Sequence, residues 1–219
     1  MAKYGLLIDL SRCIGCRACE AACKVENFVP PGKYWLYVLE WEMGEYPNVK
    51  RVFVPMNCMH CENPACIPAC PVNAITKNEY GVVLVDYNKC IGCKYCVAAC
   101  PYGAIDIYEG GEWFPGSKTP YELIPPEKRH PLHRFQKGKA FKCTLCYHRW
   151  GEAVERGEKP GTRPETTPAC VLVCPAGARM FGDLEDPSDP INSRIAEKRA
   201  IQLKKEFGTR PQVYYITTG

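Results

Sequence analysis

Residues 90–101 read Cys90-Ile-Gly-Cys93-Lys-Tyr-Cys96-Val-Ala-Ala-Cys100-Pro101 and place four cysteines in one short run. The first three are separated by two residues each, a spacing that is awkward for disulfides but suits chelation of one metal centre. The fourth follows after three residues, so Cys96 and Cys100 would lie on one face of a short helix and could reach two neighbouring centres. Pro101 would end this helix, and Gly92 would let the backbone wrap closely around the metal.

Three further blocks repeat this pattern along the chain. They are Cys13-Ile-Gly-Cys16-Arg-Ala-Cys19-Glu-Ala-Ala-Cys23, Cys58-Met-His-Cys61-Glu-Asn-Pro-Ala-Cys66-Ile-Pro-Ala-Cys70-Pro71, and a split block, Cys143-Thr-Leu-Cys146 with Cys170-Val-Leu-Val-Cys174-Pro175. Blocks one and three share CIGC and AAC, and each follows a strand-like segment that ends in Asp, at 6–9 and 82–86. Blocks two and four share Pro-Ala-Cys-x-x-x-Cys-Pro-x-x-Ala. The alternation indicates a pair of blocks used twice, through duplication of a two-cluster ferredoxin.

The composition agrees with metal sites. The chain has 219 residues, of which 16 are Cys, 20 Pro and 18 Gly, and 46% are hydrophobic. The length suggests one large domain or two smaller ones, and the short apolar runs predict a loop-rich fold that needs metal staples. No apolar run is long enough for a transmembrane helix, and we expect neither a signal peptide nor an anchor at residues 1–9. Structural disulfides are therefore disfavoured.

The type of metal follows from the spacing. The run C-x2-C-x2-C-x3-C-P is that of bacterial ferredoxins, in which the fourth Cys ligates the other cluster of a pair. We therefore predict four [4Fe–4S] clusters. Zinc sites use two CxxC pairs without a triple run, so zinc stays an alternative mainly for Cys143, Cys146, Cys170 and Cys174. A c-type haem is excluded because His directly follows none of the CxxC pairs.

The net charge changes once clusters are counted. The formal value of +4 treats every thiol as neutral. Sixteen thiolates and four cores of about +2 each would bring the net charge to about −4. The composition therefore gives no support for a nucleic-acid partner, and we expect Lys and Arg to compensate buried anionic clusters and to face acidic partners.

The four blocks resemble those of the four-cluster iron–sulfur subunits of the molybdopterin (dimethyl sulfoxide reductase) superfamily. These include electron-transfer subunits of polysulfide, thiosulfate, tetrathionate, dimethyl sulfoxide and arsenate reductases and of some formate dehydrogenases. The resemblance extends to Phe181-Gly-Asp-Leu-Glu-Asp-Pro and Gly208-Thr-Arg-Pro-Gln-Val-Tyr-Tyr. It is specific for the electron-transfer subunit and unspecific for the substrate. One departure is Lys24, where the other blocks have Pro, and it leaves the end of the first helix open.

The resemblance also implies how the cysteines pair, which their spacing leaves open. In this nested scheme the four ligand sets are Cys13, Cys16, Cys19 and Cys174; Cys23, Cys143, Cys146 and Cys170; Cys58, Cys61, Cys66 and Cys100; and Cys70, Cys90, Cys93 and Cys96. The simpler alternative pairs block one with block two and block three with block four.

The implied fold class is α+β, with two ferredoxin-like 2[4Fe–4S] domains related by duplication, loop-rich and built from short strands and helices. Residues 1–50 and 140–185 would form the first domain, with blocks one and four, and residues 51–110 the second, with blocks two and three. Residues 111–139 would be a connecting loop. Residues 186–219 would form a C-terminal helix and tail, with an amphipathic helix over 191–207.

The resemblance implies a function without bond-making catalysis. The chain would relay single electrons between a molybdopterin (Mo/W) catalytic subunit and a membrane quinone-reactive subunit, and only these partners would hold it at the cytoplasmic membrane. It would be either exported folded with its partner or cytoplasmic. A second hypothesis is a cytoplasmic subunit of a hydrogenase or formate dehydrogenase complex, and a third is a zinc-stabilised interaction module. We find no nucleophile elbow, phosphate loop or dinucleotide fingerprint.

The remaining features are less informative. The four histidines are too scattered for an active site: we favour a solvated His60 over one that tunes a cluster, His148 is a weak zinc candidate, and His130 and His133 are interpreted as loop residues. Residues 24–55, rich in aromatics, should form an extended excursion that either contacts a partner or covers a cluster. Residues 102–142 and 147–169 are interpreted as loops.

Overall fold

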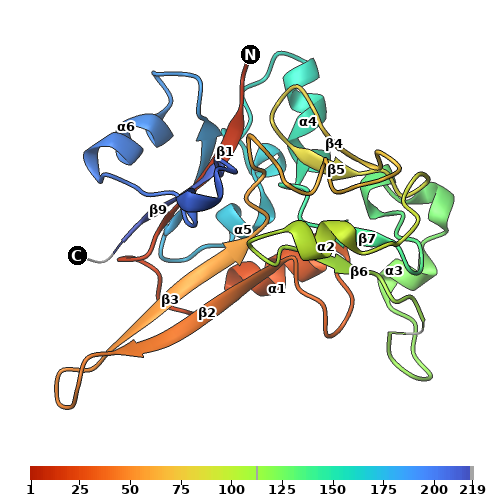
Figure 1. Ribbon diagram of the computed structural model, residues 1–219, viewed down its shortest axis with the longest axis horizontal. Helices are drawn as coiled ribbons and strands as arrows, with labels where there is room; N and C mark the ends of the chain where they lie inside the picture. The colour runs from red at the N-terminus through yellow and green to blue at the C-terminus, as the bar shows by residue number, and fades with distance from the viewer. Residues whose placement is uncertain (112, 218–219) are drawn as a thin grey trace.

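The computed structural model describes residues 1–111 and 113–217, which form short helices and strands joined by many turns (Figure 1). The α-helices are α1 (Ala18–Asn27), α2 (Tyr95–Ala99), α3 (Pro120–Leu123), α4 (Tyr147–Glu155), α5 (Ala169–Leu172) and α6 (Pro190–Glu197). The strands are β1 (Tyr4–Asp9), β2 (Leu36–Met43), β3 (Lys50–Asn57), β4 (Ile75–Lys77), β5 (Val83–Val85), β6 (Ile105–Ile107), β7 (Ala140–Lys142), β8 (Arg179–Asp183) and β9 (Val213–Ile216).

The two ends of the chain meet in one sheet. Its strand order is β8-β1-β9, with β8 antiparallel and β9 parallel to the fully buried β1. Leu6 of β1 is opposite Phe181 on one side and Val213 on the other. The segment before the first cysteine block is thereby joined to the segments that follow the fourth block. The strands expected before blocks one and three are confirmed as β1 and β5.

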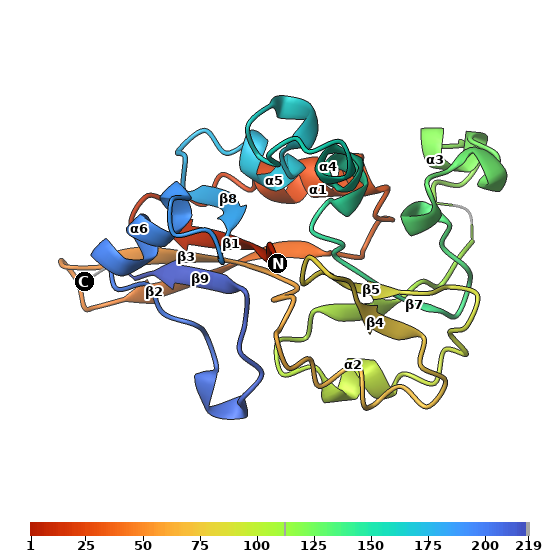
Figure 2. The ribbon, with the colours of Figure 1, turned by 90° about the horizontal axis from the view of Figure 1, so that it is seen from above.

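The other sheets are pairs of short strands. Strand β4 pairs with β5 between blocks two and three, and β6, just after block three, pairs with β7, just before block four. Figure 2 shows β4, β5 and β7 together with α2 on one side of the molecule, and α1, α4 and α5 together on the other. The chain therefore passes from one side to the other and back between the first and fourth blocks.

The excursion expected at 24–55 is largely a long hairpin. Strands β2 and β3 pair from Leu36 opposite Asn57 to Met43 opposite Lys50, and the hairpin extends away from the rest of the chain in Figure 1. Its base is buried at Leu36 and Val38, whereas Trp41 near its tip is exposed.

Aromatic side chains fill the interior between the cysteine blocks. The fully buried Trp150 of α4 contacts the rings of Tyr4, Tyr147 and Phe181, and its Nε1–H donates to the Leu145 carbonyl over 2.8 Å. These contacts attach α4 to the β8-β1-β9 sheet. The loops expected at 102–142 and 147–169 are therefore wrong in part. Residues 147–155 form α4, and β6, α3 and β7 lie within 102–142.

The C-terminal helix is shorter than the sequence pattern suggests. Helix α6 begins after Asp189, whose carboxylate accepts from the Ile191 N–H, and it ends at Glu197 rather than near 207. Arg199 takes a left-handed backbone conformation, and Ile201 then forms a β-bridge with Tyr215. The pairing with the sheet draws the chain out of the helix. In the described part of the chain, we find no helix with the length and apolar character required to cross a bilayer.

Candidate metal centres

Three small cavities are each lined by four cysteines. We name these groups quartet A, quartet C and quartet D. Quartet A is Cys13, Cys16, Cys19 and Cys174; quartet C is Cys58, Cys61, Cys66 and Cys100; and quartet D is Cys70, Cys90, Cys93 and Cys96. In each group three cysteines come from one block and the fourth from a distant block, so the fold is needed to complete the group.

The other four cysteines surround one buried thiol. Cys143, Cys146 and Cys170 lie close enough to Cys23 for their charges to raise its pKa, although burial is the larger cause of that increase. Cys23 and Cys146 also share a donor, because the Asn27 Nδ2 lies 3.7 Å from the Sγ of each. We name this group quartet B. All sixteen cysteines are thus distributed over four groups.

Short helices place successive cysteines in neighbouring quartets. On α1, Cys19 belongs to quartet A and Cys23 to quartet B, and α1 packs against α5, which carries Cys170 (Figure 2). On α2, Cys96 belongs to quartet D, and Cys100 directly follows the helix in quartet C. The spacing of four residues therefore acts as expected in these blocks, with one thiol directed to each centre.

Block two departs from this rule. The segment around Cys66 and Cys70 forms turns rather than a helix, with N–H bonds from Ile67 to the Pro64 carbonyl and from Cys70 to the Ile67 carbonyl. Both bonds span three residues, and Pro68 has no N–H to add a bond to the Pro64 carbonyl. The short helix expected in this block is wrong, but the two cysteines still reach quartets C and D.

Block one departs in the opposite direction. Because Lys24 does not interrupt the helix as proline would, α1 continues to Asn27 and ends at Phe28 in a left-handed conformation. The extra turn buries Asn27 and points its amide at Cys23, four residues earlier. The open question about the end of the first helix is therefore resolved by the structure.

Backbone N–H groups are directed at several of the sulfur atoms. The Ala74 N–H donates to the Cys70 Sγ over 3.2 Å, and the Ala178 N–H donates to the Cys174 Sγ over 3.3 Å. Both alanines end a Cys-Pro-x-x-Ala motif, and block three repeats it with Ala104, whose backbone bonds to Cys100. The Leu145 N–H likewise donates to the Cys143 Sγ over 3.4 Å. Such donors stabilise negative charge on sulfur, so they fit thiolate ligands of an anionic cluster.

Burial shifts the cysteine pKa values upward. It raises the pKa of Cys61, Cys66 and Cys143 to about 12, with neighbouring thiols adding to the effect. For Cys19 and Cys96, burial raises the pKa to about 11. The thiols are therefore neutral at pH 7 unless positive charge is present among them, and metal binding at these positions must release protons.

The quartets follow one another in the order A, B, C, D. Helices α1 and α5 connect A with B, and α2 and the 66–70 turn connect C with D. Between the middle quartets, the Cys58 charge raises the pKa of Cys143, after the larger effect of burial. The row of quartets reaches the protein surface at its two ends, quartets A and D. Cys16 and Cys93 are exposed there, and the neighbouring Ile14 and Ile91 are each 63% exposed.

The hairpin covers quartet A. Val38 of β2 and Pro55 of β3 line the cavity of this quartet. The Phe53 ring packs so closely on Gly15 that a Cβ there would overlap it. At quartet D, the Gly138 carbonyl packs closely on Gly92 and occupies the space that a Cβ there would need. Both CIGC loops therefore need glycine, at φ values of +67° and +74°.

His60 is buried rather than solvated, so the interpretation favoured from the sequence is wrong. Its Nδ1 accepts from the Val83 N–H over 3.1 Å, and its side chain is only 1% exposed. Burial, with a smaller effect from Lys142, holds its pKa well below the usual value. His60 is therefore neutral at pH 7 next to quartet C.

The other three histidines form a group that the sequence does not indicate. His148 bonds Glu26 with an Nε2–Oε1 distance of 2.8 Å, and its ring lies 4.5 Å from that of His133 and 5.7 Å from that of His130. His133 is buried, so the expectation that it is an ordinary loop residue is wrong. Within residues 1–111 and 113–217, no three His, Cys, Asp or Glu side chains are arranged to hold a single metal ion.

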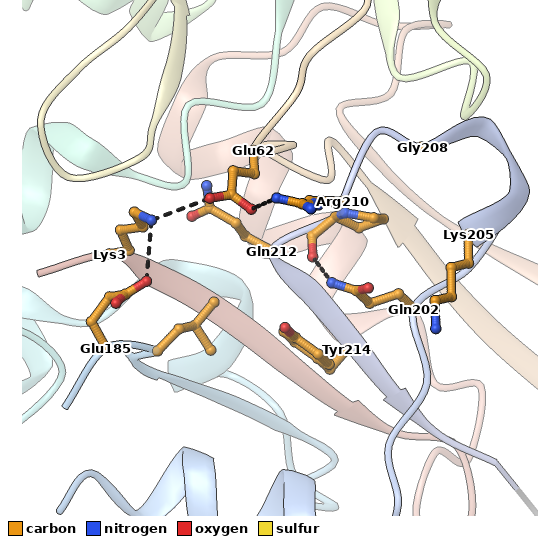
Figure 3. Close-up of a pocket in the computed structure, with 11 residues that line it drawn as sticks. Lys3, Glu62, Glu185, Gln202, Lys205, Gly208, Arg210, Gln212 and Tyr214 are labelled. Carbon is orange, nitrogen blue, oxygen red and sulfur yellow. Dashed lines mark hydrogen bonds and ion pairs between the residues drawn. The ribbon is translucent and has the colours of Figure 1, made fainter. Parts of the chain in front are cut away.

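A polar cavity of about 440 Å³ lies away from the quartets (Figure 3). Lys3 at its edge pairs with Glu185 over 3.1 Å and with Glu62 over 3.4 Å, and Arg210 pairs with Glu62 over 3.6 Å. Figure 3 shows Lys3 between the two carboxylates. The charged side chains of this cavity pair with one another. These ion pairs link the N-terminal segment, block two and the C-terminal segment.

Comparison with known proteins agrees with this arrangement. The family described as "4Fe-4S dicluster domain" matches residues 12–74 and 89–178, and a second family of the same description matches residues 49–112. The chain is 38% identical to a subunit of the selenate reductase of Mesobacillus selenatarsenatis, over 98% of this chain and 72% of that protein. It is 34% identical to the iron–sulfur subunit of the arsenate respiratory reductase of a Shewanella species, over 98% and 96%. It is 35% identical to the iron–sulfur cluster-binding subunit of the menaquinone reductase of Nitratidesulfovibrio vulgaris, over 98% and 89%.

Proposed function

This chain belongs to the family of 4Fe-4S dicluster iron–sulfur subunits of molybdopterin oxidoreductases, and from that membership we propose that it relays single electrons through quartets A, B, C and D. Its donors and acceptors are a molybdopterin (Mo/W) catalytic subunit and a membrane quinone-reactive subunit. Each quartet holds one [4Fe–4S] cluster, which supplies one-electron chemistry when bound. The relative named as a menaquinone reductase subunit supports the link to a quinone.

The observation that carries this proposal is the row of four cysteine quartets with exposed ends. Quartets B and C lie inside, whereas quartets A and D each have one exposed cysteine, Cys16 and Cys93. A relay needs two accessible ends and sites that adjoin one another. The exposed cysteines supply the ends, and α1, the interaction of Cys58 with Cys143 and α2 link successive quartets. The protein itself spaces the ligands, excludes water and directs N–H donors at sulfur.

The pairing supports two domains that arose by duplication. Quartets A and B would belong to a first domain of residues 1–50 and 140–185, and quartets C and D to a second of residues 51–110. The matching N–H donors of Ala74 and Ala178 favour a common origin. The β2–β3 hairpin crosses the boundary at 50/51, so we move that boundary to the end of the hairpin, near residue 57. Residues 111–139 connect the domains, and residues 186–219 return to β1 through β9.

A peripheral position at the cytoplasmic membrane follows from this role. The chain would be held there by its partner subunits, either after export in the folded state with its partner or on the cytoplasmic side.

The exposed isoleucines allow a direct test of the two ends. In the anaerobically purified native complex, Ile14→Glu should slow electron exchange with one partner and Ile91→Glu with the other, because each places a charge at one end of the row. Iron and sulfide contents should remain those of the wild type. The exposed Val25→Glu serves as a control away from both CIGC loops.

The measurement is the rate at which menaquinol or the catalytic subunit's substrate changes the visible absorbance of the clusters. Equal effects of Ile14→Glu and Ile91→Glu on both rates would contradict a relay with two ends. Recovery of a hydrogenase subunit instead of a molybdopterin subunit in the purified complex would contradict the proposed partner.

A further inference from the structure

Two positively charged side chains are buried beside the quartets without a carboxylate partner. Arg179 is 4% exposed and Lys142 is 2% exposed. Within the described ranges neither forms an ion pair with Asp or Glu, unlike the surface cations Lys3 and Arg210. A buried charge without a counter-charge is strongly unfavourable, so the fold must provide negative charge of another kind at both positions.

Arg179 lies between quartets A and B. It begins β8 opposite Ile8 and lines the cavity of quartet A. Its Nη2 donates to the Asn57 Oδ1 over 2.9 Å, whereas its buried Nε and Nη1 have no oxygen or nitrogen acceptor among the described residues. The negative charges of Cys170 in quartet B and Cys19 in quartet A both raise the arginine pKa against the opposing effect of burial.

The anchoring of Arg179 is rigid. The Asn57 side chain that accepts from it also donates, through Nδ2, to the Cys58 carbonyl over 2.7 Å. The guanidinium is thereby fixed at the end of β3, and the Cys170 side chain of quartet B is a further hydrogen-bond partner for it. Sulfur atoms of the adjacent centres are acceptors of the right kind, because they carry negative charge.

Lys142 has the equivalent place between quartets B and C. It lies on β7 directly before Cys143, and its Nζ donates to the carbonyl of Cys143 over 2.9 Å and to that of Val83, which lines the cavity of quartet C. Its charge lowers the pKa of Cys66 and Cys100 in quartet C and of Cys143 in quartet B, in each case against a larger opposing effect of burial.

We propose that Arg179 and Lys142 are positioning residues for electron transfer that set the reduction potentials of the centres beside them, Arg179 for quartets A and B and Lys142 for quartets B and C. This inference rests on the proposed function, because it requires clusters in the quartets. Uptake of one electron, from a reduced mediator in the test below, adds one negative charge and breaks no bond. A fixed positive charge in a low-dielectric interior favours that reduced state. Arginine is suited to this role because it does not lose its proton.

Quartet D is the internal reference. Neither Arg179 nor Lys142 lines its cavity, and the one Lys or Arg that does, among the described residues, is Lys94. The potential of the centre at D should therefore not respond to removal of either buried cation. Any general loosening of the protein would instead affect all four centres.

The experiment is an anaerobic potentiometric titration followed by EPR, with iron and acid-labile sulfide counted first and signals assigned through single Cys→Ser variants. Arg179→Met should lower the reduction equilibrium constants at A and B at least tenfold, which is about 59 mV for one electron, and leave D unchanged. Arg179→Lys should recover most of the shift, because it keeps the charge. Lys142→Met should lower the reduction potentials of the centres at C and B and leave those at A and D unchanged. The exposed, ion-paired Arg156→Met is the control and should change none.

The two proposals fail in different ways. Wild-type protein without iron and sulfide would remove the relay itself. Full iron and sulfide, with no shift in Arg179→Met or with equal shifts at all four centres, would overturn only the assignment of the two cations. If Arg179→Met loses its iron, Lys142→Met decides the question by the same comparison of C with A and D.

Discussion

Asn27→Leu should selectively lower the potential of the centre in quartet B. Asn27 is 1% exposed, and its Nδ2 lies 3.7 Å from the Sγ of both Cys23 and Cys146. Leucine has nearly the same size, so the substitution removes the donor without opening a large cavity. Loss of an N–H directed at sulfur disfavours the more negative, reduced state.

The contacts set the size of the effect. Hydrogen bonds to charged groups contribute about 1.5–3 kcal/mol, but the two amide hydrogens are shared between the two sulfurs and the Cys23 carbonyl, which lies 3.1 Å from the Nδ2. We therefore take about 1 kcal/mol for the two sulfur contacts together, which corresponds to a fall of about 45 mV in a one-electron midpoint potential. Quartets A, C and D, which Asn27 does not contact, should keep their potentials.

The assay is the redox titration followed by EPR, with Asn192→Leu as the matched control. The Asn192 Nδ2 donates to the carbonyls of Asp183 and Asp186 over 2.9 and 2.7 Å, so its loss removes comparable hydrogen bonds away from sulfur. The control should cost stability and leave all potentials unchanged. An unchanged potential at B in Asn27→Leu, with full iron and sulfide, would refute the reasoning.

Three further predictions test the pairing, the packing and the pH dependence. Cys174→Ser should perturb the EPR signal of the centre at quartet A, since the nested scheme assigns Cys174 to it. Gly92→Ala should lower the urea midpoint by far more than Gly103→Ala, because φ is positive at both residues but only the Cβ at 92 meets backbone; strain alone costs about 1–2 kcal/mol. Burial lowers the pKa of His133 to about 3, so below pH 6.5 the unfolded chain binds one more proton than the folded protein. The free energy of unfolding therefore decreases as the pH is lowered. His133→Phe should reduce that slope by up to about 1.4 kcal/mol per pH unit, in denaturation experiments between pH 7 and 5.5.

Each of these three predictions would be contradicted by a specific result. A change confined to the centre of Cys143 and Cys146 in Cys174→Ser would mean that the nested scheme is wrong. Equal midpoints for Gly92→Ala and Gly103→Ala would count against close packing over the third block. An unaltered pH slope in His133→Phe would show that His133 is protonated in the folded protein or is not buried.

Local features of the sequence were enough to indicate the chemistry. Thiolate spacing, the strands before blocks one and three, and the helices that carry Cys19 and Cys96 all depend on neighbouring residues. Block two was not predictable in this way, because proline is accepted in the first turn of a helix and Pro68 alone therefore does not exclude one. The nested pairing depends on distant contacts, and spacing alone leaves it open.

Long-range packing determined what the sequence could not indicate. His148 lies on α4 and His133 ends the turn at Pro131–His133, and the fold brings their rings to 4.5 Å although no motif connects them. Arg179 has no distinguishing signal in the sequence, and only the fold, through β8, places it beside two quartets. Asn27 has one weak signal, since it lies four residues after Cys23 where the other blocks place an alanine N–H. The C-terminal helix was overestimated because the pairing of Ile201 with Tyr215 outweighs its amphipathic pattern.

Iron and acid-labile sulfide analysis of anaerobically purified protein tests the central claim most directly. Four [4Fe–4S] clusters predict about 16 iron and about 16 sulfide per chain, with EPR signals from interacting centres after reduction. Colourless protein that stays free of iron after reconstitution, or that contains about four zinc ions with negligible sulfide, would contradict the account.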